Sequence, residues 1–162
     1  MTARIVLVLV RIEARELASL VAQFAELLGE RSAAPDADLA RLTPTAYPDD
    51  EDAAAEFRAA TAGDLLDRRE REALRMLADL TPAFDGDDPN DPIQVVLSRE
   101  DGWAWLRTLT ALRLVIAGRL GITEDDGSRE NDDERFAVYD WLGYRLDTLV
   151  HALDGQDREE QD

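Results

Sequence analysis

Two residue types are missing from this sequence of 162 amino acids, cysteine and lysine. Without cysteine the chain cannot form a disulfide, sense oxidants through a thiol or hold zinc through sulfur. Its 18 basic residues are therefore all arginines, and they face 36 aspartates and glutamates, which leaves a net charge of −18. The absence of lysine is typical of GC-rich coding or of adaptation to salt, and it assigns no function.

Long apolar runs are also missing. The apolar stretch Ile5–Val10 has only six residues, which is too short for the core of a signal peptide or for a membrane span. The glycine motifs that cradle nucleotide phosphates are absent as well, and no serine or acid lies in a recognisable catalytic context. We therefore expect a cytoplasmic protein without a membrane segment or a cofactor.

The negative charge is concentrated in the second half of the chain. Residues 1–80 contain 10 arginines and 16 carboxylates, a net charge of −6, whereas residues 81–162 contain 8 and 20, a net charge of −12. Many of these acids lie in two stretches, 85–91 and 124–134. Because nucleic-acid binding gains most of its affinity from neutralised phosphates, such a chain repels DNA and anionic membranes and attracts basic proteins.

The hydrophobic pattern predicts an α+β fold that is predominantly helical. Two β-branched runs, Ile5–Val10 and Ile93–Leu97, are expected to pair as a small two-stranded sheet, because neither can be left exposed with its backbone unpaired. The first run extends over residues 4–12. We expect a single domain over 1–154 and a disordered acidic tail over 155–162. The helical periodicity indicates about five helices, at 13–29, 49–62, 64–80, 98–120 and 132–153, with Gly63 separating the second from the third.

The segment RLGITEDDGSRENDDER, residues 119–135, follows a helix that Ser98 is expected to cap. Gly121 suits the position just beyond the helix end, where a left-handed backbone is needed, and Ile122 can pack back onto the helix. An EF-hand with glycine at position six needs an acid at position one, but with Gly127 as the sixth residue the first is Ile122. No metal site is predicted. The segment is either a solvated connector or a recognition surface.

Three charged residues stand in apolar surroundings. Arg113 and Arg119 interrupt an apolar helical segment, and Asp140 lies among aromatic residues. A charge in such a place must reach water along its stem or pair with an opposite charge. We predict a structural cluster in which Asp140 pairs with Arg113 or Arg119 between two helices, and a ligand pocket is the alternative. His151, the only histidine, is predicted to be a surface residue without a catalytic role.

The stripe of Arg68, Arg71 and Arg75 is the only local basic patch. Such a patch can contact nucleic acid, but each of these arginines has a carboxylate four residues away, and pairs at that spacing stabilise a helix. We therefore predict intrahelical salt bridges here rather than a nucleic-acid surface. The predicted pairs are Asp64–Arg68, Asp67–Arg71 and Arg75–Asp79.

Three segments together resemble one known family: AEFRAATAGDL, DGWAWLRTLTALRLVIAGRLGITEDD and AVYDWLGYRLDTLVHAL. It is an actinobacterial domain-of-unknown-function family, encoded near the ClpS protease adaptor, that includes oxidative-stress transcriptional regulators of the AosR type. The resemblance runs from about residue 40 to residue 153. It implies a non-enzymatic regulator that works with the transcription machinery through a sigma factor. A cysteine-based switch cannot operate in this chain.

We therefore expect a protein that is not an enzyme, binds no cofactor and acts by binding a basic protein partner such as a sigma factor. The residues expected to contact that partner are Asp125, Asp126, Asp132 and Asp133. Two alternatives stay open. One is a regulator that binds DNA directly, and the other is an enzyme or small-molecule binder with a pocket near Arg113 and Arg119.

Overall fold

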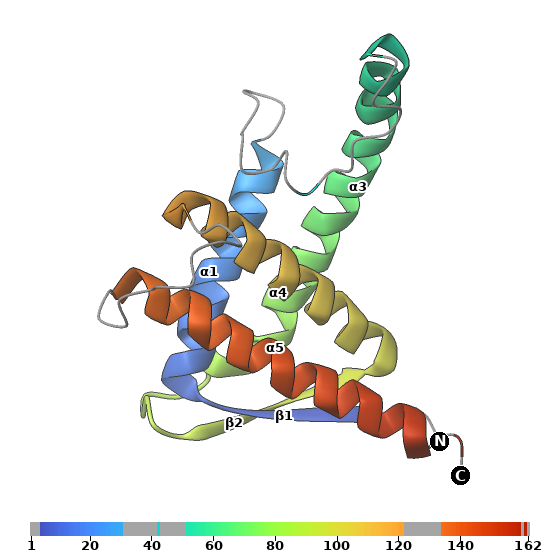
Figure 1. The fold of residues 1–162 in the computed structure, drawn as a ribbon. Helices are drawn as coiled ribbons and strands as arrows, with labels where there is room; N and C mark the ends of the chain where they lie inside the picture. Colours follow the sequence, from blue (N-terminus) through green and yellow to red (C-terminus); the bar gives the residue numbers. More distant parts are fainter. Residues whose placement is uncertain (1–3, 31–41, 43–50, 122–133, 160, 162) are drawn as a thin grey trace.

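The computed structural model describes residues 4–30, 42, 51–121, 134–159 and 161, and the side chains of 51–60, 62, 134 and 135 lie outside this description. The predicted class, α+β with a predominance of helix, is confirmed (Figure 1). The elements are β1 (Arg4–Val10), α1 (Arg11–Gly29), α3 (Glu51–Asp79), the 3-10 turn η1 (Thr81–Phe84), β2 (Pro92–Ser98), α4 (Arg99–Leu120) and α5 (Glu134–Glu159).

The two strands form one antiparallel sheet, with Ile5 opposite Leu97 and Leu9 opposite Ile93. Because side chains alternate along a strand, one face of the sheet collects the apolar residues of both strands. On that face Ile5, Leu9, Ile93, Val95 and Leu97 are buried against the helices. The predicted pairing of these two runs is therefore confirmed.

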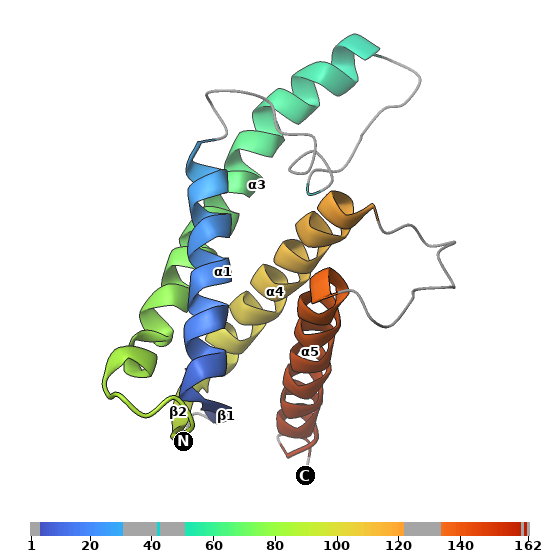
Figure 2. The same ribbon diagram turned by 90° about the vertical axis from the view of Figure 1, so that its left-hand side faces the viewer.

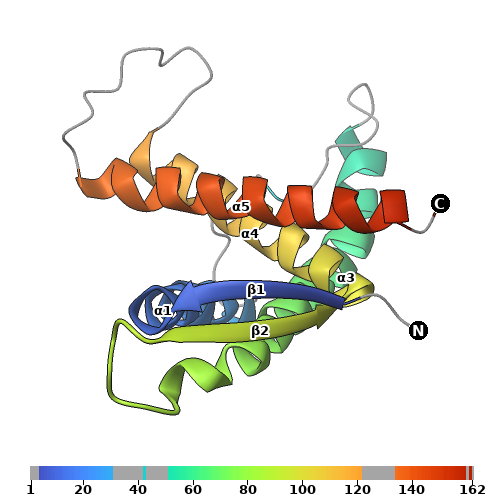
Figure 3. The same ribbon diagram turned by 90° about the horizontal axis from the view of Figure 1, so that it is seen from below.

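The helices lie over this inner face of the sheet (Figures 2 and 3). α1 packs along α3, α4 packs against α3 and α5, and α5 lies beside β1. Buried apolar side chains from the strands and the helices form one cluster, and their removal from water is the main stabilising contribution. Its largest fully buried apolar members are Trp105, Leu17, Leu28, Met76, Leu80, Leu97, Leu109, Leu142, Leu149, Leu153 and Val21.

The prediction of two helices between residues 49 and 80 is wrong. α3 is one continuous helix of 29 residues, Glu51–Asp79, so the described part of the chain holds four α-helices rather than about five. A glycine ends a helix when it adopts a left-handed backbone, but Gly63 is not among the described glycines with positive φ. Inside a helix a glycine costs only about 1 kcal/mol relative to alanine, which a long packed helix tolerates.

The predicted ends of α4 are confirmed. The Ser98 side chain accepts a hydrogen bond from the backbone N–H of Asp101 at 3.1 Å, as an N-cap residue does. Gly121 has φ of 69° and its N–H returns to the last turn of the helix. Ile122, predicted to pack back onto the helix, lies outside the described residues.

The helix α5 continues to Glu159, six residues beyond the predicted end at Leu153. The expectation of a disordered tail is therefore wrong for residues 155–159, which are helical. Gln156 is only 7% exposed, and Asp157 forms an ion pair with Arg99 at the start of α4. These contacts extend the packing of α5 along α4, which a composition rich in polar residues does not reveal.

Candidate functional site

An acidic loop joins η1 to β2 at the end of the sheet where β1 finishes (Figure 3). We call residues 85–91 the acidic loop. It carries Asp85, Asp87, Asp88 and Asp91, and all seven residues of the loop are exposed. This is one of the two acidic stretches that the sequence singled out, and it is the one that the structure describes.

The first turn of α1 holds the acidic loop by its backbone carbonyls. Arg11, which is only 7% exposed, donates from Nη1 to Asp88 O at 2.5 Å and forms an ion pair with Asp91 at 3.3 Å. Arg15 donates from Nε to Ala83 O at 3.0 Å and from Nη2 to Gly86 O at 2.6 Å. The loop's conformation is therefore tied to the core, while three of its four carboxylates are left out of these contacts.

The backbone of α1 completes this attachment. The N–H groups at the start of a helix have no acceptor within the helix, and here Arg11 N donates to Asp91 O at 2.8 Å and Ile12 N to Pro89 O at 2.9 Å. α1 therefore begins at Arg11, two residues before the predicted start. Gly86 has φ of 150°, and a Cβ there would lie 2.5 Å from Nη2 of Arg11, so the loop needs a glycine at this point.

The outer face of the sheet carries exposed valines beside Arg4 and Gln94, and the described part of the chain does not cover it. Val6, Val8 and Val96, which we call the valine face, are each at least 50% exposed. Phe84, next to the acidic loop, is 58% exposed, and the guanidinium of Arg15 lies 5.9 Å from its ring centroid. Apolar groups gathered on a surface beside charged groups are typical of protein interaction sites.

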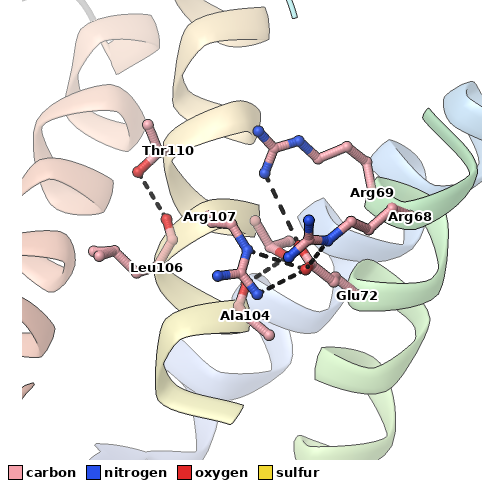
Figure 4. A network of polar contacts seen from close by, with 8 residues as sticks. Arg68, Arg69, Glu72, Ala104, Leu106, Arg107 and Thr110 are labelled. Atoms are coloured by element: carbon pink, nitrogen blue, oxygen red, sulfur yellow. Dashed lines mark hydrogen bonds and ion pairs between the residues drawn. The ribbon is translucent and has the colours of Figure 1, made fainter. Parts of the chain in front are cut away.

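A second polar feature joins α3 to α4, and we call it the arginine cluster (Figure 4). Glu72 lies between Arg68 and Arg69 of its own helix and Arg107 of α4. Its Oε1 accepts from Arg107 Nε at 3.0 Å, from Arg107 Nη2 at 2.8 Å and from Arg68 Nε at 3.3 Å. One carboxylate thus forms ion pairs with three guanidinium groups.

Arg69 is the least compensated member of the arginine cluster. Its Nη1 approaches Glu72 Oε2 only to 3.9 Å, and its buried Nε has no hydrogen-bond partner in the described structure. Burial lowers the pKa of Arg69 from its ordinary value, Glu72 opposes that shift, and the positive charges of Arg107 and Arg68 add to it. A charge held in this way destabilises its surroundings unless another group relieves it.

The fold that carries both features is shared with a known family. A family model described as a domain of unknown function (DUF2017) matches residues 1–153. The chain belongs to this family. No curated protein and no solved structure matches the chain. The DUF2017 region spans β1 through most of α5, so the acidic loop, the valine face and the arginine cluster all lie within it.

Within this DUF2017 chain, Arg113 of the predicted cluster with Arg119 and Asp140 stacks on an aromatic ring. The guanidinium of Arg113 lies 3.9 Å from the ring centroid of Tyr139 and donates from Nε to Tyr139 O at 3.2 Å. A Cβ at Gly143 would lie 2.8 Å from Nη2 of Arg113, so this glycine makes room for the stacked arginine. Asp140 itself is exposed, and its pairing with Arg113 or Arg119 stays a prediction.

The alternative of a ligand pocket around Arg113 and Arg119 stays a prediction for this DUF2017 chain. Arg119 is exposed and lines a hollow of about 60 Å³ with Leu20 and Phe24, and Arg113 is not part of it. That volume has room for only a few water molecules.

Among the described residues, no three of histidine, aspartate and glutamate gather as a metal site would require. No helix among them is long and apolar enough to cross a bilayer.

Asp125, Asp126, Asp132 and Asp133 lie outside the described residues, as does the rejected calcium loop. Their role in partner binding stays a prediction. His151 is exposed, and its Nδ1 lies 2.6 Å from Asp147 O of the same helix, which agrees with the predicted surface position.

Of the three predicted intrahelical salt bridges, Asp64–Arg68 and Arg75–Asp79 are wrong, and Asp67–Arg71 stays a prediction. Arg68 pairs with Glu72 rather than Asp64, and Arg75 pairs with Asp101 of α4 at 3.1 Å rather than with Asp79. Asp79 instead accepts a hydrogen bond from the indole of Trp105 at 2.9 Å.

Five charged residues of these sites were missed by the sequence reasoning: Glu72, Arg69, Arg107, Arg11 and Arg15. The spacing of Glu72 from Arg68 and Arg69 could have indicated the first two of them. No spacing signal exists for the other three, because the groups they contact lie 35 to 80 residues away in the chain.

Proposed function

We propose that this DUF2017 protein is a non-enzymatic regulator that binds a basic protein partner in the cytoplasm. The family resemblance suggests a sigma factor, whose DNA-reading regions are commonly basic. The observation that carries the proposal is the acidic loop, which α1 holds through backbone carbonyls while Asp85, Asp87 and Asp88 are exposed.

Charge supports a protein partner rather than DNA. Residues 81–162 have a net charge of −12, from 8 arginines and 20 carboxylates, and the acidic loop belongs to this half. A field of this sign speeds the approach of a positive surface and slows the approach of phosphates. Charges at the rim of an interface, however, contribute more to the rate of association than to affinity.

The valine face supplies apolar contact area, which the carboxylates cannot supply. Apolar area removed from water contributes about 25 cal/mol per Å², and Val6, Val8 and Val96 offer such area on a two-stranded sheet. A partner with basic residues beside an apolar patch complements both parts of the surface. The acidic loop then guides the partner to the surface, and the valine face slows its dissociation.

The test is a binding series with candidate sigma factors at rising salt, beside the same series with promoter DNA. The triple variant Asp85→Asn, Asp87→Asn and Asp88→Asn should slow association about tenfold at low salt, with a smaller effect at high salt because ions screen the field. A variant with the same charge change on exposed residues of α5, at Asp147, Asp154 and Glu159, is the matched control and should act weakly.

Further variants separate the parts of the proposal. Val8→Ser should speed dissociation more than Val150→Ser, its matched control on α5, where Val150 is 38% exposed. Neutralising Asp125, Asp126, Asp132 and Asp133 should slow association as well. Tight binding of promoter DNA by the isolated protein, or partner binding indifferent to salt and to all of these changes, would defeat the proposal.

A further inference from the structure

The arginine cluster carries more positive charge than its carboxylate can balance. Three guanidinium groups surround one glutamate, so the cluster has a net charge of +2 in a chain whose net charge is −18. Two of the three arginines are partly withdrawn from solvent, with side-chain exposures of 21% for Arg69 and 35% for Arg107. Water therefore screens their mutual repulsion less than at an open surface.

A small movement of the Glu72 side chain cannot balance this excess of positive charge. Its Oε1 already accepts three hydrogen bonds, and the side chain is only 11% exposed. If Arg69 closed the 3.9 Å gap to Oε2, that oxygen would gain a donor, but the two surplus positive charges would remain. The cluster therefore retains both unused N–H donors and uncompensated charge.

We propose that the arginine cluster binds a small phosphate-bearing anion between Arg69, Arg107 and Arg68. A phosphate group in its dianionic form would cancel the net charge of +2. Its oxygens point in several directions and suit guanidinium forks that come from two helices, whereas a second carboxylate would bring only one charge and two oxygens.

The open side of the cluster lets such an anion enter from solvent. Arg68 is 58% exposed and Arg107 is 35% exposed, while the buried Nε of Arg69 marks the inner limit of the site. The shared chemistry is the phosphate group, and its source is either free inorganic phosphate or the monoester of a small metabolite. The site is separate from the acidic loop and does not depend on the proposed partner.

The experiment measures thermal unfolding and calorimetric binding of the full chain with inorganic phosphate and, separately, with glycerol phosphate. Sodium chloride at matched ionic strength is the control for screening. Phosphate should raise the unfolding midpoint, because a ligand that binds only the folded state stabilises it, and chloride should not. Glycerol phosphate should bind more tightly at pH 8 than at pH 5, because the second ionisation of a monoester has a pKa of about 6.

The variant Arg69→Met tests the site itself. It should weaken phosphate binding by about tenfold or more, the loss expected when a charged donor is removed. The ligand-free variant should remain folded and at least as stable as the parent, because the change removes a desolvated charge that makes no hydrogen bond. Arg71→Met, an exposed position on the same helix, is the matched control and should bind phosphate as the parent does.

Binding of inorganic phosphate alone would support the site and identify the free anion as its ligand. Binding of both compounds would support a site open to monoesters. Stabilisation by phosphate no greater than that by chloride would overturn the proposal, as would equal loss of binding in Arg69→Met and Arg71→Met.

Discussion

Replacing Arg11 with methionine tests whether the shape of the acidic loop, and not only its charge, serves partner binding. Arg11 is 7% exposed and joins the first turn of α1 to the loop through Asp88 O and Asp91. Methionine retains much of the apolar stem but has no donor. The contacts of the loop with the backbone of α1 and with Arg15 are left in place.

The expected loss in the free energy of unfolding is about 2–4 kcal/mol. The hydrogen bond from the charged guanidinium to Asp88 O accounts for about 1.5–3 kcal/mol of it. The ion pair with Asp91 adds at most about 1 kcal/mol, because that carboxylate is 55% exposed and water screens it. Urea unfolding measures the change, and the slope with denaturant should be unaltered because the fold is the same.

Arg71→Met is the matched control for charge. Arg71 is exposed on α3, away from the loop and the sheet, and removing either arginine takes the net charge from −18 to −19. If charge alone governed partner binding, both variants would bind a basic partner slightly faster than the parent. If the loop's shape matters, Arg11→Met should bind more weakly, and hydrogen exchange of the loop amides should be faster in that variant alone.

A stability loss below about 0.5 kcal/mol would refute the energetic reasoning, since it would leave no room for a hydrogen bond from a buried charge. Partner binding by Arg11→Met equal to that of Arg71→Met, despite faster exchange of the loop, would refute the role assigned to loop shape.

Three further predictions concern the fold. Trp105→Phe removes the hydrogen bond to Asp79 and leaves a small cavity, so urea unfolding should show a free energy of unfolding lower by about 2–3 kcal/mol. The control Trp103→Phe, at a more exposed position, should lose less than about 0.5 kcal/mol. Gly63→Ala should stabilise the protein by about 0.4–1 kcal/mol, because a Cβ there meets nothing within 4 Å. A loss of stability in this variant would mean that α3 is not continuous. Asp140→Asn should change the stability by less than about 1 kcal/mol, because the side chain is exposed, and a loss near that of a broken buried pair would contradict this position.

The parts of the fold that local chemistry decides were predictable from the sequence. Ser98 and Gly121 end α4 as expected, because the cap interactions involve neighbours within a few residues. The pairing of the two strands was predictable for another reason, since two apolar runs without other partners had to satisfy their backbones together. Gly63 was misassigned because a glycine's effect depends on its backbone conformation, which residue type alone does not determine.

The polar contacts were harder to predict because they join distant parts of the chain. Arg11 and the carbonyl of Asp88 are 77 residues apart, and Glu72 and Arg107 are 35 apart. The exposure of Asp140 was equally hard to predict, because an apolar neighbourhood in the sequence does not show which way a helix turns a residue. The helix turns this residue outward, while Leu142 and Leu149 face the core.

The positions of the charges let the protein's surface distinguish between ligands more sharply than its net charge suggests. Several arginines are occupied in holding the fold: Arg11 and Arg15 bind loop carbonyls, Arg113 stacks on Tyr139, and Arg107 binds Glu72. The acidic loop, by contrast, presents its carboxylates to solvent without an arginine in front of most of them. Its four carboxylates outnumber the two arginines that hold it, so a basic partner approaching the loop meets a net negative field. The positive excess is gathered at the arginine cluster between α3 and α4. This separation is the physical basis for expecting two different ligands, a basic protein at the loop and a phosphate-bearing anion at the cluster.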